Sequence, residues 1–113
     1  GIVSTLARDG GDALSPCVDW VFFVRDDSWG GRLPGSTQLS PTSAAIVANS
    51  HEIVAIGGGD IARDELRGAR QAGKVVTFVA ADMNHRIARD KALAKGQRAP
   101  TDFGGAAAAE FAR

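Results

Sequence analysis

Three consecutive glycines and a nearby glutamate are the residues of this chain best placed to do chemistry. They lie in residues 53–66, IVAIGGGDIARDEL, where an apolar β-branched run leads into the glycines and then into a helical pattern. Glycines at such a turn let a ligand approach the backbone, and the free amides and dipole of the next helix favour an anion such as a phosphate. The segment predicts an anion-binding turn made of Gly57, Gly58, Gly59 and Asp60. The alternative is a tight strand-to-helix turn without a ligand.

Glu65 is the one charged residue out of place in the helix that should follow this turn. With about 100° between successive residues, it falls in the middle of an apolar arc. That arc holds Ile61, Ala62, Leu66, Gly68, Ala69 and Ala72, and the opposite arc holds Arg63, Asp64, Arg67, Arg70 and Gln71. A carboxylate that faces a core is strongly unfavourable unless it is paired, hydrogen-bonded or neutralised. Glu65 is therefore a candidate catalytic residue; alternatively, it holds the glycine turn through its amides or pairs with Arg25 or Arg32.

Apolar runs predict three parallel strands that position this turn. The runs are short, rich in β-branched or aromatic residues and nearly continuous, which is typical of strands covered on both faces. They span residues 18–24 (VDWVFFV), 53–56 (IVAI) and 75–80 (VVTFVA). Helical patterns alternate with them, so the sequence predicts one α/β domain over residues 1–113, a Rossmann-like open parallel sheet with helices on both faces.

Cap residues set the expected ends of the helices. Ser40 and Pro41 fit the cap and first position of a helix that runs to about Asn49. Asp60 should cap the helix after the glycines, and Gly73 should end it. The remaining helices are expected over residues 2–16, over residues 85–95 with Asn84 as the cap, and from a cap at Thr101 or Asp102 to Arg113.

Three strands make a thin sheet, and a chain that begins within a helix looks truncated. One expectation is that a first strand and its glycine turn are missing before Gly1. The other is an N-terminal helix over residues 2–8 that packs on the sheet, with a partner subunit covering the open edge. A homodimer is the expected assembly.

Two further loops should meet the glycine turn, because the carboxyl ends of parallel strands lie at one edge of a sheet. Arg25, Asp26 and Trp29 follow the first strand, and Asp82 and Asn84 follow the third. Trp29 either stacks on a ligand or is a core tryptophan under a lid. Asp82 and Asn84 either hold a ribose hydroxyl or, more simply, shape a turn and cap a helix. All five are candidate ligand-binding residues.

Composition and charge exclude several classes of partner and site. The 113 residues include 13 Lys and Arg and 13 Asp and Glu, without a basic cluster, so neither nucleic acid nor a membrane is an expected partner. The single Cys17 allows no internal disulfide, and no run is apolar enough to cross a membrane, which fits the reducing cytoplasm. His51 and His85 lack the neighbours of a metal site, and we expect no metal and no cofactor.

Residues 57–66, GGGDIARDEL, resemble the PGGxGTxxE segment of the Lonely-Guy-type phosphoribohydrolases and of the wider SLOG superfamily of Rossmann-like nucleotide binders. The resemblance extends over residues 50–80 and includes ARQAGKVVTF. It implies that Gly58 and Gly59 hold a nucleotide phosphate and that Glu65 acts at the N-glycosidic bond.

Departures from that segment favour binding over hydrolysis. Gly57 stands in place of the proline, and Ile61 and Ala62 stand in place of the Gly-Thr pair. The helix expected at 41–49 also lacks the arginine that those hydrolases carry. The chain is thus more similar to SLOG members proposed as nucleotide sensors, including the LSDAT-like branch in the cytosolic part of melastatin-type channels. This resemblance implies a sensor or regulatory module that binds a nucleotide or nucleotide-derived ligand.

A second resemblance keeps enzymatic turnover as the alternative. Glu65, Gly73 and Lys74 fit the pattern of nucleoside deoxyribosyltransferases, in which a glutamate on the helix after the second loop is followed by Gly-Lys-x-Val. Cleavage of an N-glycosidic bond passes through an oxocarbenium-like state, which a preorganised carboxylate stabilises or traps. The alternative function is therefore an N-glycosidic hydrolase or transferase that uses Glu65.

Overall fold

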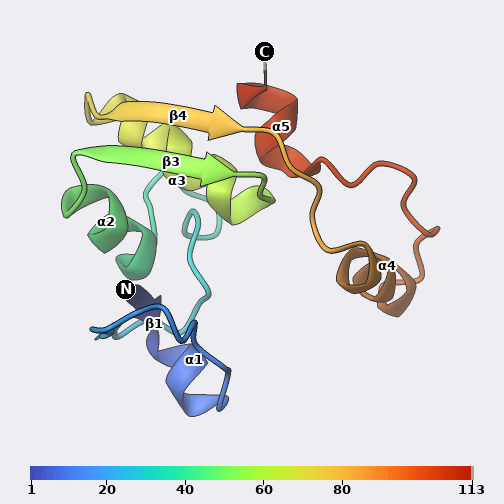
Figure 1. Cartoon of the computed structure of the whole chain (residues 1–113), viewed down its shortest axis with the longest axis horizontal. Helices are drawn as coiled ribbons and strands as arrows, with labels where there is room; N and C mark the ends of the chain where they lie inside the picture. The colour runs from blue at the N-terminus through green and yellow to red at the C-terminus, as the bar shows by residue number, and fades with distance from the viewer. Residues whose placement is uncertain (113) are drawn as a thin grey trace.

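The computed structural model describes residues 1–112 as an α/β structure in which short parallel strands alternate with helices (Figure 1). In chain order, the elements are β1 (Ile2–Ser4), α1 (Thr5–Asp9), β2 (Phe22–Val24), α2 (Pro41–Ala48), β3 (Glu52–Ile56), α3 (Asp60–Gln71), β4 (Val75–Val79), α4 (His85–Ala94) and α5 (Gly105–Phe111). The predicted α/β class is confirmed. Arg113, the expected end of the last helix, lies outside the described residues.

The strands form two separate parallel pairs rather than one continuous sheet. β1 pairs with β2, with Ile2 opposite Phe22, and β3 pairs with β4, with Glu52 opposite Val75. In Figure 1 the second pair lies above α2 and the first pair below it. The single open sheet that the sequence predicts is therefore not continuous within residues 1–112. β1 and β2 have only three residues each, so few of their backbone groups are available for hydrogen bonds to the β3–β4 pair.

The first helix is shorter than predicted, and a strand precedes it. Ile2 and Val3 are β-branched residues that favour extended backbone, and they form β1 with Ser4. Ser4 then caps α1, because its hydroxyl accepts a hydrogen bond from the Leu6 amide at 3.1 Å. The helix expected from Ile2 is therefore wrong for Ile2–Ser4, which form a strand, and is confirmed for residues 5–8.

β2 is also shorter than predicted, because residues 18–21 lie outside the strand. Only Phe22–Val24 pair with β1, and the Trp20 side chain before them is 76% exposed. The other two predicted strands agree with β3 and β4 to within one residue at each end.

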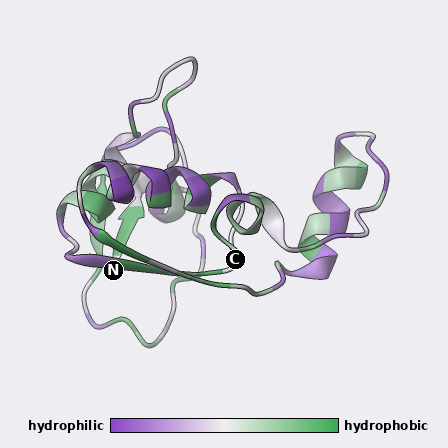
Figure 2. Cartoon of the chain, turned by 90° about the horizontal axis from the view of Figure 1, so that it is seen from above, coloured by the Kyte–Doolittle hydropathy of each residue, from purple (hydrophilic) through white to green (hydrophobic). Residues whose placement is uncertain are grey.

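One face of the β3–β4 pair is exposed to solvent within the described residues. Along both strands, exposed residues alternate with partly buried ones. The inner side chains Ile53, Ala55, Val76 and Phe78 pack against the core, whereas the outer face carries Val54, Ile56, Val75 and Val79, and Ile56 is 72% exposed. Parallel strands are usually covered on both faces, as the sequence predicts here. That prediction is wrong within the described residues, because α4 stands apart from the strands and leaves the outer face open (Figures 1 and 2).

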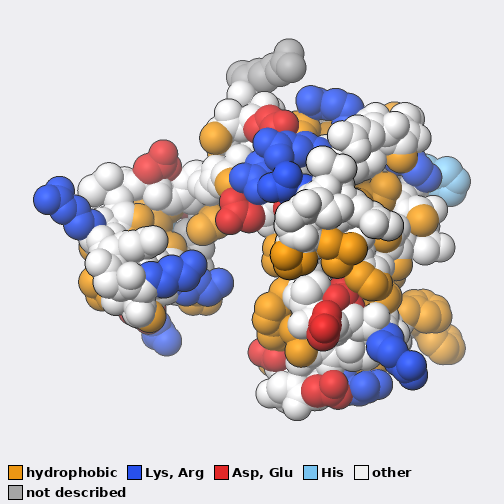
Figure 3. Space-filling view, turned by 180° about the vertical axis from the view of Figure 1, so that it is seen from behind, with side chains coloured by type: hydrophobic (Ala, Val, Ile, Leu, Met, Phe, Trp, Pro, Cys, Tyr) orange, Lys and Arg blue, Asp and Glu red, His pale blue; other side chains and the backbone are white. Residues whose placement is uncertain are grey.

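The core lies between the β3–β4 pair, α3 and α5. Leu66 of α3 is fully buried, as is Ala107 of α5, and Phe111 is 8% exposed. Arg67 of α3 and Glu110 of α5 form an ion pair at 2.7 Å across the two helices. In Figure 3, basic and acidic side chains gather where these helices meet. The alanine-rich C-terminal helix therefore closes the core over α3.

Three of the predicted cap residues, Ser40, Asn84 and Gly73, lie where the sequence places them, although the Ser40 hydroxyl makes no capping hydrogen bond within residues 1–112. Pro41 is the first residue of α2 after Ser40, and the Asn84 side chain accepts a hydrogen bond from the Ile87 amide at 2.9 Å at the start of α4. Gly73, with φ of 75°, follows the end of α3. Asp60 is not a cap: it is the first residue of α3, and Gly59 occupies the cap position without a side-chain hydrogen bond. α5 begins at Gly105, later than the caps expected at Thr101 or Asp102.

Candidate functional site

The glycine turn between β3 and α3 is shaped by the surrounding fold. Gly57 has φ of 65° and Gly58 has φ of 129°, which side-chain-bearing residues rarely adopt. A Cβ atom at Gly57 would lie 2.7 Å from the Ala81 carbonyl oxygen, and one at Gly58 would overlap the Ala62 Cβ. These two glycines are therefore required by the backbone and its neighbours, whether or not a ligand binds.

Gly59 differs from the two glycines before it. Its φ is −96°, and a Cβ atom there would meet only the Met83 sulfur at 3.6 Å, an ordinary contact. A positive φ therefore does not require glycine at this position, in contrast to Gly57 and Gly58. Gly59 therefore lies on an open surface at the start of α3, where its missing side chain leaves room beside the helix.

The first turn of α3 has unpaired backbone amides. In α1, α2 and α4 a side-chain oxygen accepts a hydrogen bond from a first-turn amide. In α3 the amides of Asp60, Ile61 and Ala62 have no partner within residues 1–112, and the first paired amide is that of Arg63, which donates to the Gly59 carbonyl at 3.0 Å. The Asp60 carboxylate is exposed and contacts Arg63 at 3.2 Å. Of these four helices, α3 is therefore the one whose start has no side-chain cap among the described residues, which suits an anion.

The start of α5 and the segment after β4 flank the glycine turn. The Gly58 carbonyl accepts a hydrogen bond from the Ala107 amide at 3.2 Å, and the Met83 amide donates to the Phe103 carbonyl at 2.7 Å. Gly105 has φ of 80°, and a Cβ atom on it would overlap the Gly58 oxygen. One side of the turn is therefore closed by α5.

Asp26, in the loop after β2, is bound by the protein itself. Its carboxylate is buried and accepts four hydrogen bonds: from the amide and hydroxyl of Ser28 at 2.9 and 2.8 Å, and from the amide and hydroxyl of Thr42 at 2.9 and 2.7 Å. Burial by itself would raise the pKa of this carboxyl, but the hydrogen bonds from Thr42 and Ser28 outweigh it and hold the pKa well below its ordinary value. Asp26 therefore fills the N-terminus of α2, and its predicted role in binding a ligand stays a prediction.

Glu65 reaches from α3 to the start of α2. The buried Ser43 hydroxyl donates to Glu65 Oε1 at 2.7 Å and accepts from the Gly31 amide at 2.8 Å. Glu65 is half-buried, in agreement with the inward position that the helical wheel predicts. Burial raises the pKa of its carboxyl, the hydrogen bond from Ser43 lowers it, and the nearby Asp64 charge raises it. Arg25 and Arg32, the partners considered from the sequence, make no ion pair with Glu65 within residues 1–112.

The loop after β2 meets the first turns of α3 near Glu65. A Cβ atom at Gly30, where φ is 125°, would lie 3.2 Å from Ile61 Cγ2 and 3.7 Å from Glu65 Oε1. Trp29, the residue before Gly30, is 55% exposed, so the alternative of a covered core tryptophan is wrong. The structure thus brings together Glu65, the loop that carries Trp29 and the start of α3.

The remaining candidate residues lie elsewhere or have other partners. Asp82 contacts the His85 ring at 2.9 Å, and Asn84 caps α4, which agrees with the simpler of their two predicted roles. Arg25 is exposed. A ribose contact at Asp82 or Asn84 and a ligand contact at Arg25 stay predictions.

Asp64 is the site residue that sequence reasoning missed. The helical wheel places it on the solvent-facing arc, yet it is only 6% exposed. It accepts a hydrogen bond from the Arg32 amide at 3.1 Å and pairs with the Arg63 guanidinium at 3.1 Å. The helical periodicity does not predict that Asp64 is buried, because the residues that cover it belong to the loop 32–39, far from α3 in the sequence. Ser43 was also missed, although the hydroxyl-rich run SPTS at 40–43 is a signal of a helix start that can hold such contacts.

Within the part of the chain that the structure describes, no three metal-ligating side chains come together. In the same residues, no helix combines the length and apolar character needed to cross a membrane. No family model matches the chain, and neither the curated proteins nor the solved structures include one that matches it.

Proposed function

We propose that this chain binds a nucleotide or nucleotide-derived ligand through an anionic group at the start of α3, and that it works as a sensor or regulatory module. The observation that carries the proposal is the unpaired first turn of α3. The amides of Asp60, Ile61 and Ala62 have no partner within residues 1–112, whereas the corresponding end of α2 is filled by Asp26. Such amides, with the helix dipole behind them, suit a phosphate.

A nucleotide is favoured over a bare phosphate because of the groups around this helix end. Trp29 offers an exposed aromatic face on which a base can stack, and the loop that carries it contacts Ile61 in the first turn of α3. The Glu65 carboxylate lies beside the same loop, since a Cβ atom at Gly30 would lie 3.7 Å from Glu65 Oε1, and it is the acceptor that we propose for a sugar hydroxyl. An anion seat, an aromatic ring and a hydrogen-bond acceptor are the three kinds of group that a nucleotide needs.

We also propose that the two strand pairs belong to a Rossmann-like arrangement with strand order 2-1-3-4. The parallel pairs β1–β2 and β3–β4 are two of the three neighbouring pairs that this order requires, and the third pair, β1 beside β3, is not hydrogen-bonded within residues 1–112. In such a sheet, ligands bind at the carboxyl ends of strands 1 and 3, where the order reverses. The groups at those ends in this chain are Ser4 and the glycine turn, so the proposed fold and the proposed site support each other.

Glu65 gives a second candidate function, cleavage of an N-glycosidic bond. Its carboxylate is half-buried, and a fully buried hydroxyl holds it at 2.7 Å, which is the preorganisation that stabilisation of an oxocarbenium-like state requires. Binding without turnover remains the first proposal, because α2 carries no arginine beside this carboxylate.

Gly59→Val tests the anion seat with little effect on the fold. A side chain at Gly59 meets only Met83 at an ordinary distance, so the variant should melt within a few degrees of the parent. The parent should be stabilised by nucleoside mono- and diphosphates or by NAD in a thermal-shift panel, by about 2.7 kcal/mol at 100 times Kd. The valine should remove this stabilisation, because its methyl groups occupy the approach to the α3 amides.

A matched control adds the same bulk away from the turn. Ala48→Val, at an exposed position of α2, should leave the ligand response unchanged. A parent that no nucleotide stabilises would refute nucleotide binding, and a folded Gly59→Val variant with unchanged affinity would place the ligand elsewhere.

We further propose that the chain forms a homodimer through the outer face of the β3–β4 pair. Four β-branched side chains are exposed there, and parallel strands rarely leave such a face in water. The double variant Val54→Lys, Ile56→Lys should change a dimer to a monomer in sedimentation experiments without lowering the melting temperature of the monomer. Ile87→Lys, on α4 and 52% exposed, is the matched control. A parent that sediments as a monomer at every concentration would contradict the proposed interface.

A further inference from the structure

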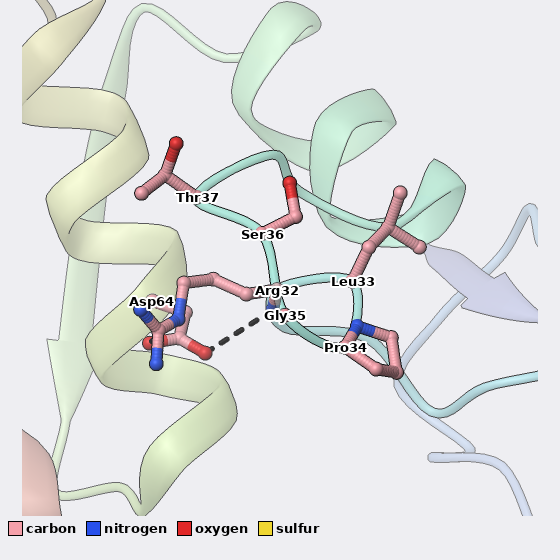
Figure 4. Close-up of a pocket in the computed structure, with 7 residues that line it drawn as sticks. All are labelled: Arg32, Leu33, Pro34, Gly35, Ser36, Thr37 and Asp64. Atoms are coloured by element: carbon pink, nitrogen blue, oxygen red, sulfur yellow. Dashed lines mark hydrogen bonds and ion pairs between the residues drawn. The ribbon is translucent and has the colours of Figure 1, made fainter.

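Two adjoining cavities lie between the loop 32–39 and α3, on a different side of α3 from Glu65. Their volumes are about 390 and about 290 Å³, and Arg32, Thr37 and Asp64 line both of them. Arg67 and Gln71 of α3 line the second cavity. Figure 4 shows the first cavity, with the Arg32 side chain reaching from the loop toward Asp64 on the helix. We call the two cavities together the Arg32 groove.

The loop that forms one wall of the Arg32 groove is held at both ends. Arg32 and Leu39 form an antiparallel bridge, and the Ser40 amide donates to the Gly31 carbonyl at 2.7 Å. Leu39 packs against Gly68 of α3 so closely that a Cβ atom there would lie 2.6 Å from Leu39 Cδ1. The wall is therefore preorganised, and a ligand need not order it on binding.

The charged groups in the Arg32 groove are paired unequally. Asp64 is satisfied, because its oxygens accept from the Arg32 amide and from the Arg63 guanidinium, both at 3.1 Å. Arg67 is engaged by Glu110 at 2.7 Å. The Arg32 guanidinium, by contrast, approaches Asp64 only to 3.6 Å, beyond hydrogen-bond distance, and has no hydrogen-bond partner within residues 1–112. Its donors are thus available to a ligand.

Two neutral donors share the groove with Arg32. Thr37 and Gln71 line the second cavity, and neither side chain makes a hydrogen bond within the described part of the chain. A guanidinium fork together with a hydroxyl and an amide is a donor set for an oxyanion, since Arg binds carboxylate and phosphate through two parallel hydrogen bonds. The Asp64 carboxylate lies 3.6 Å from the guanidinium and attracts it without a hydrogen bond, so the anion would bind the donors that do not face Asp64.

We propose that the Arg32 groove is a second binding site, which takes the oxyanion of a small molecule, a phosphate or a carboxylate group, with Arg32 as its main ligand. This site is separate from the proposed nucleotide seat at Gly59 and does not depend on it. Thr37 and Gln71 contribute the further hydrogen bonds, and Asp64 is a positioning residue.

The test is a titration of the whole chain with inorganic phosphate and, separately, with succinate at constant ionic strength. Amide shifts in nuclear magnetic resonance spectra report where each probe binds. Shifts at Thr37 and Gln71 are expected for at least one probe, and the stronger probe identifies the source of the oxyanion. A response confined to Asp60 and Ile61, or no response to either probe, would overturn the proposal.

Variants separate the groove from general charge effects. Arg32→Gln should weaken binding at Thr37 and Gln71 about tenfold or more, because a charge-assisted fork is lost. It should stay folded, since Asp64 keeps the Arg63 guanidinium and the backbone amide of residue 32. Arg32→Lys, which keeps the charge without the fork, should recover part of the affinity, and Arg89→Gln on α4 should change nothing. Equal affinity in Arg32→Gln and Arg89→Gln would overturn the role of Arg32, and unchanged binding in Gly59→Val would show that the two sites are independent.

Discussion

Asp26→Asn is expected to lower the free energy of unfolding by about 2 to 4 kcal/mol at pH 7. The carboxylate accepts four hydrogen bonds, two on each oxygen, from Ser28 and Thr42. An asparagine replaces one oxygen by an NH₂ group that cannot accept, so the donors of Ser28 or those of Thr42 lose their partner. Urea denaturation of the purified variant measures the loss.

Asp27 provides the matched control. It is the next residue and has the same side chain, but it is exposed. Asp27→Asn should change the free energy of unfolding by no more than about 0.5 kcal/mol. Similar losses for the two variants would contradict the role of Asp26 as the cap of α2.

Acid should act through the same carboxylate. The hydrogen bonds hold the pKa of Asp26 well below 3.8 in the folded chain, against the opposing effect of burial. A carboxyl group whose pKa is lower in the folded state stabilises the fold above the unfolded pKa, and the stabilisation is lost as the pH falls. The stability difference between the parent and Asp26→Asn should therefore be constant near neutral pH and shrink below about pH 4.

Glu65→Gln is expected to keep or raise the melting temperature while removing the ligand response. Burial raises the pKa of Glu65 above 4.5, with the Ser43 hydrogen bond opposing it and the Asp64 charge adding to it. A raised pKa means that ionisation is unfavourable in the folded chain, so the stabilisation present at low pH is lost as the pH rises through the folded pKa. Glutamine avoids this ionisation and can still accept the hydrogen bond from Ser43.

The functional half of this prediction depends on the charge. If the carboxylate recognises a sugar or stabilises an oxocarbenium-like state, the variant should lose about tenfold or more in affinity, or about 10²–10⁴ in rate if bases are released from nucleotides. Thermal shift measures the first and chromatography of the released base measures the second. Glu52→Gln, at an exposed position of β3, is the control with the same charge change.

A large drop in the melting temperature of the Glu65→Gln variant would contradict the functional interpretation of Glu65. If Glu65 were only a structural anchor, its removal should cost about 3 to 5 kcal/mol, as breaking a buried charged contact does. The folded fraction would then bind nucleotides as the parent does. Stability and binding measured on one preparation distinguish the two roles.

Local chemistry in the sequence was enough to place several elements. Pro41 after Ser40, Asn84 before α4 and Gly73 after α3 act through their own backbone or a neighbour within three residues, so their positions could be predicted without the fold. The apolar runs that became β3 and β4 were also predictable, because β-branched residues favour extended backbone.

Features that depend on distant segments could not be predicted. Asp64 lies on the polar arc of its helix, and only the loop 32–39 makes it buried. The sequence offers Asp26 only as a candidate ligand-binding residue, whereas its hydrogen bonds with Thr42, 16 positions away, make it the cap of α2. The outer face around Ile56 is exposed because α4 lies away from it. The apolar residues of α4 are scattered around the helix, so the sequence does not predict where this helix packs.

The position of α4 also has a consequence for local unfolding. α4 has no buried residue, and ten-residue helices are marginal in water, so its amides should exchange hydrogen by opening that leaves the core intact. Yet α4 lies within a longer segment, residues 83–105, and both ends of that segment, Met83 and Gly105, lie against the glycine turn. A hydrogen bond from the Met83 amide to the Phe103 carbonyl closes the segment. Opening of the segment that contains α4 should therefore loosen the contacts of Met83 and Gly105 with the turn that precedes α3.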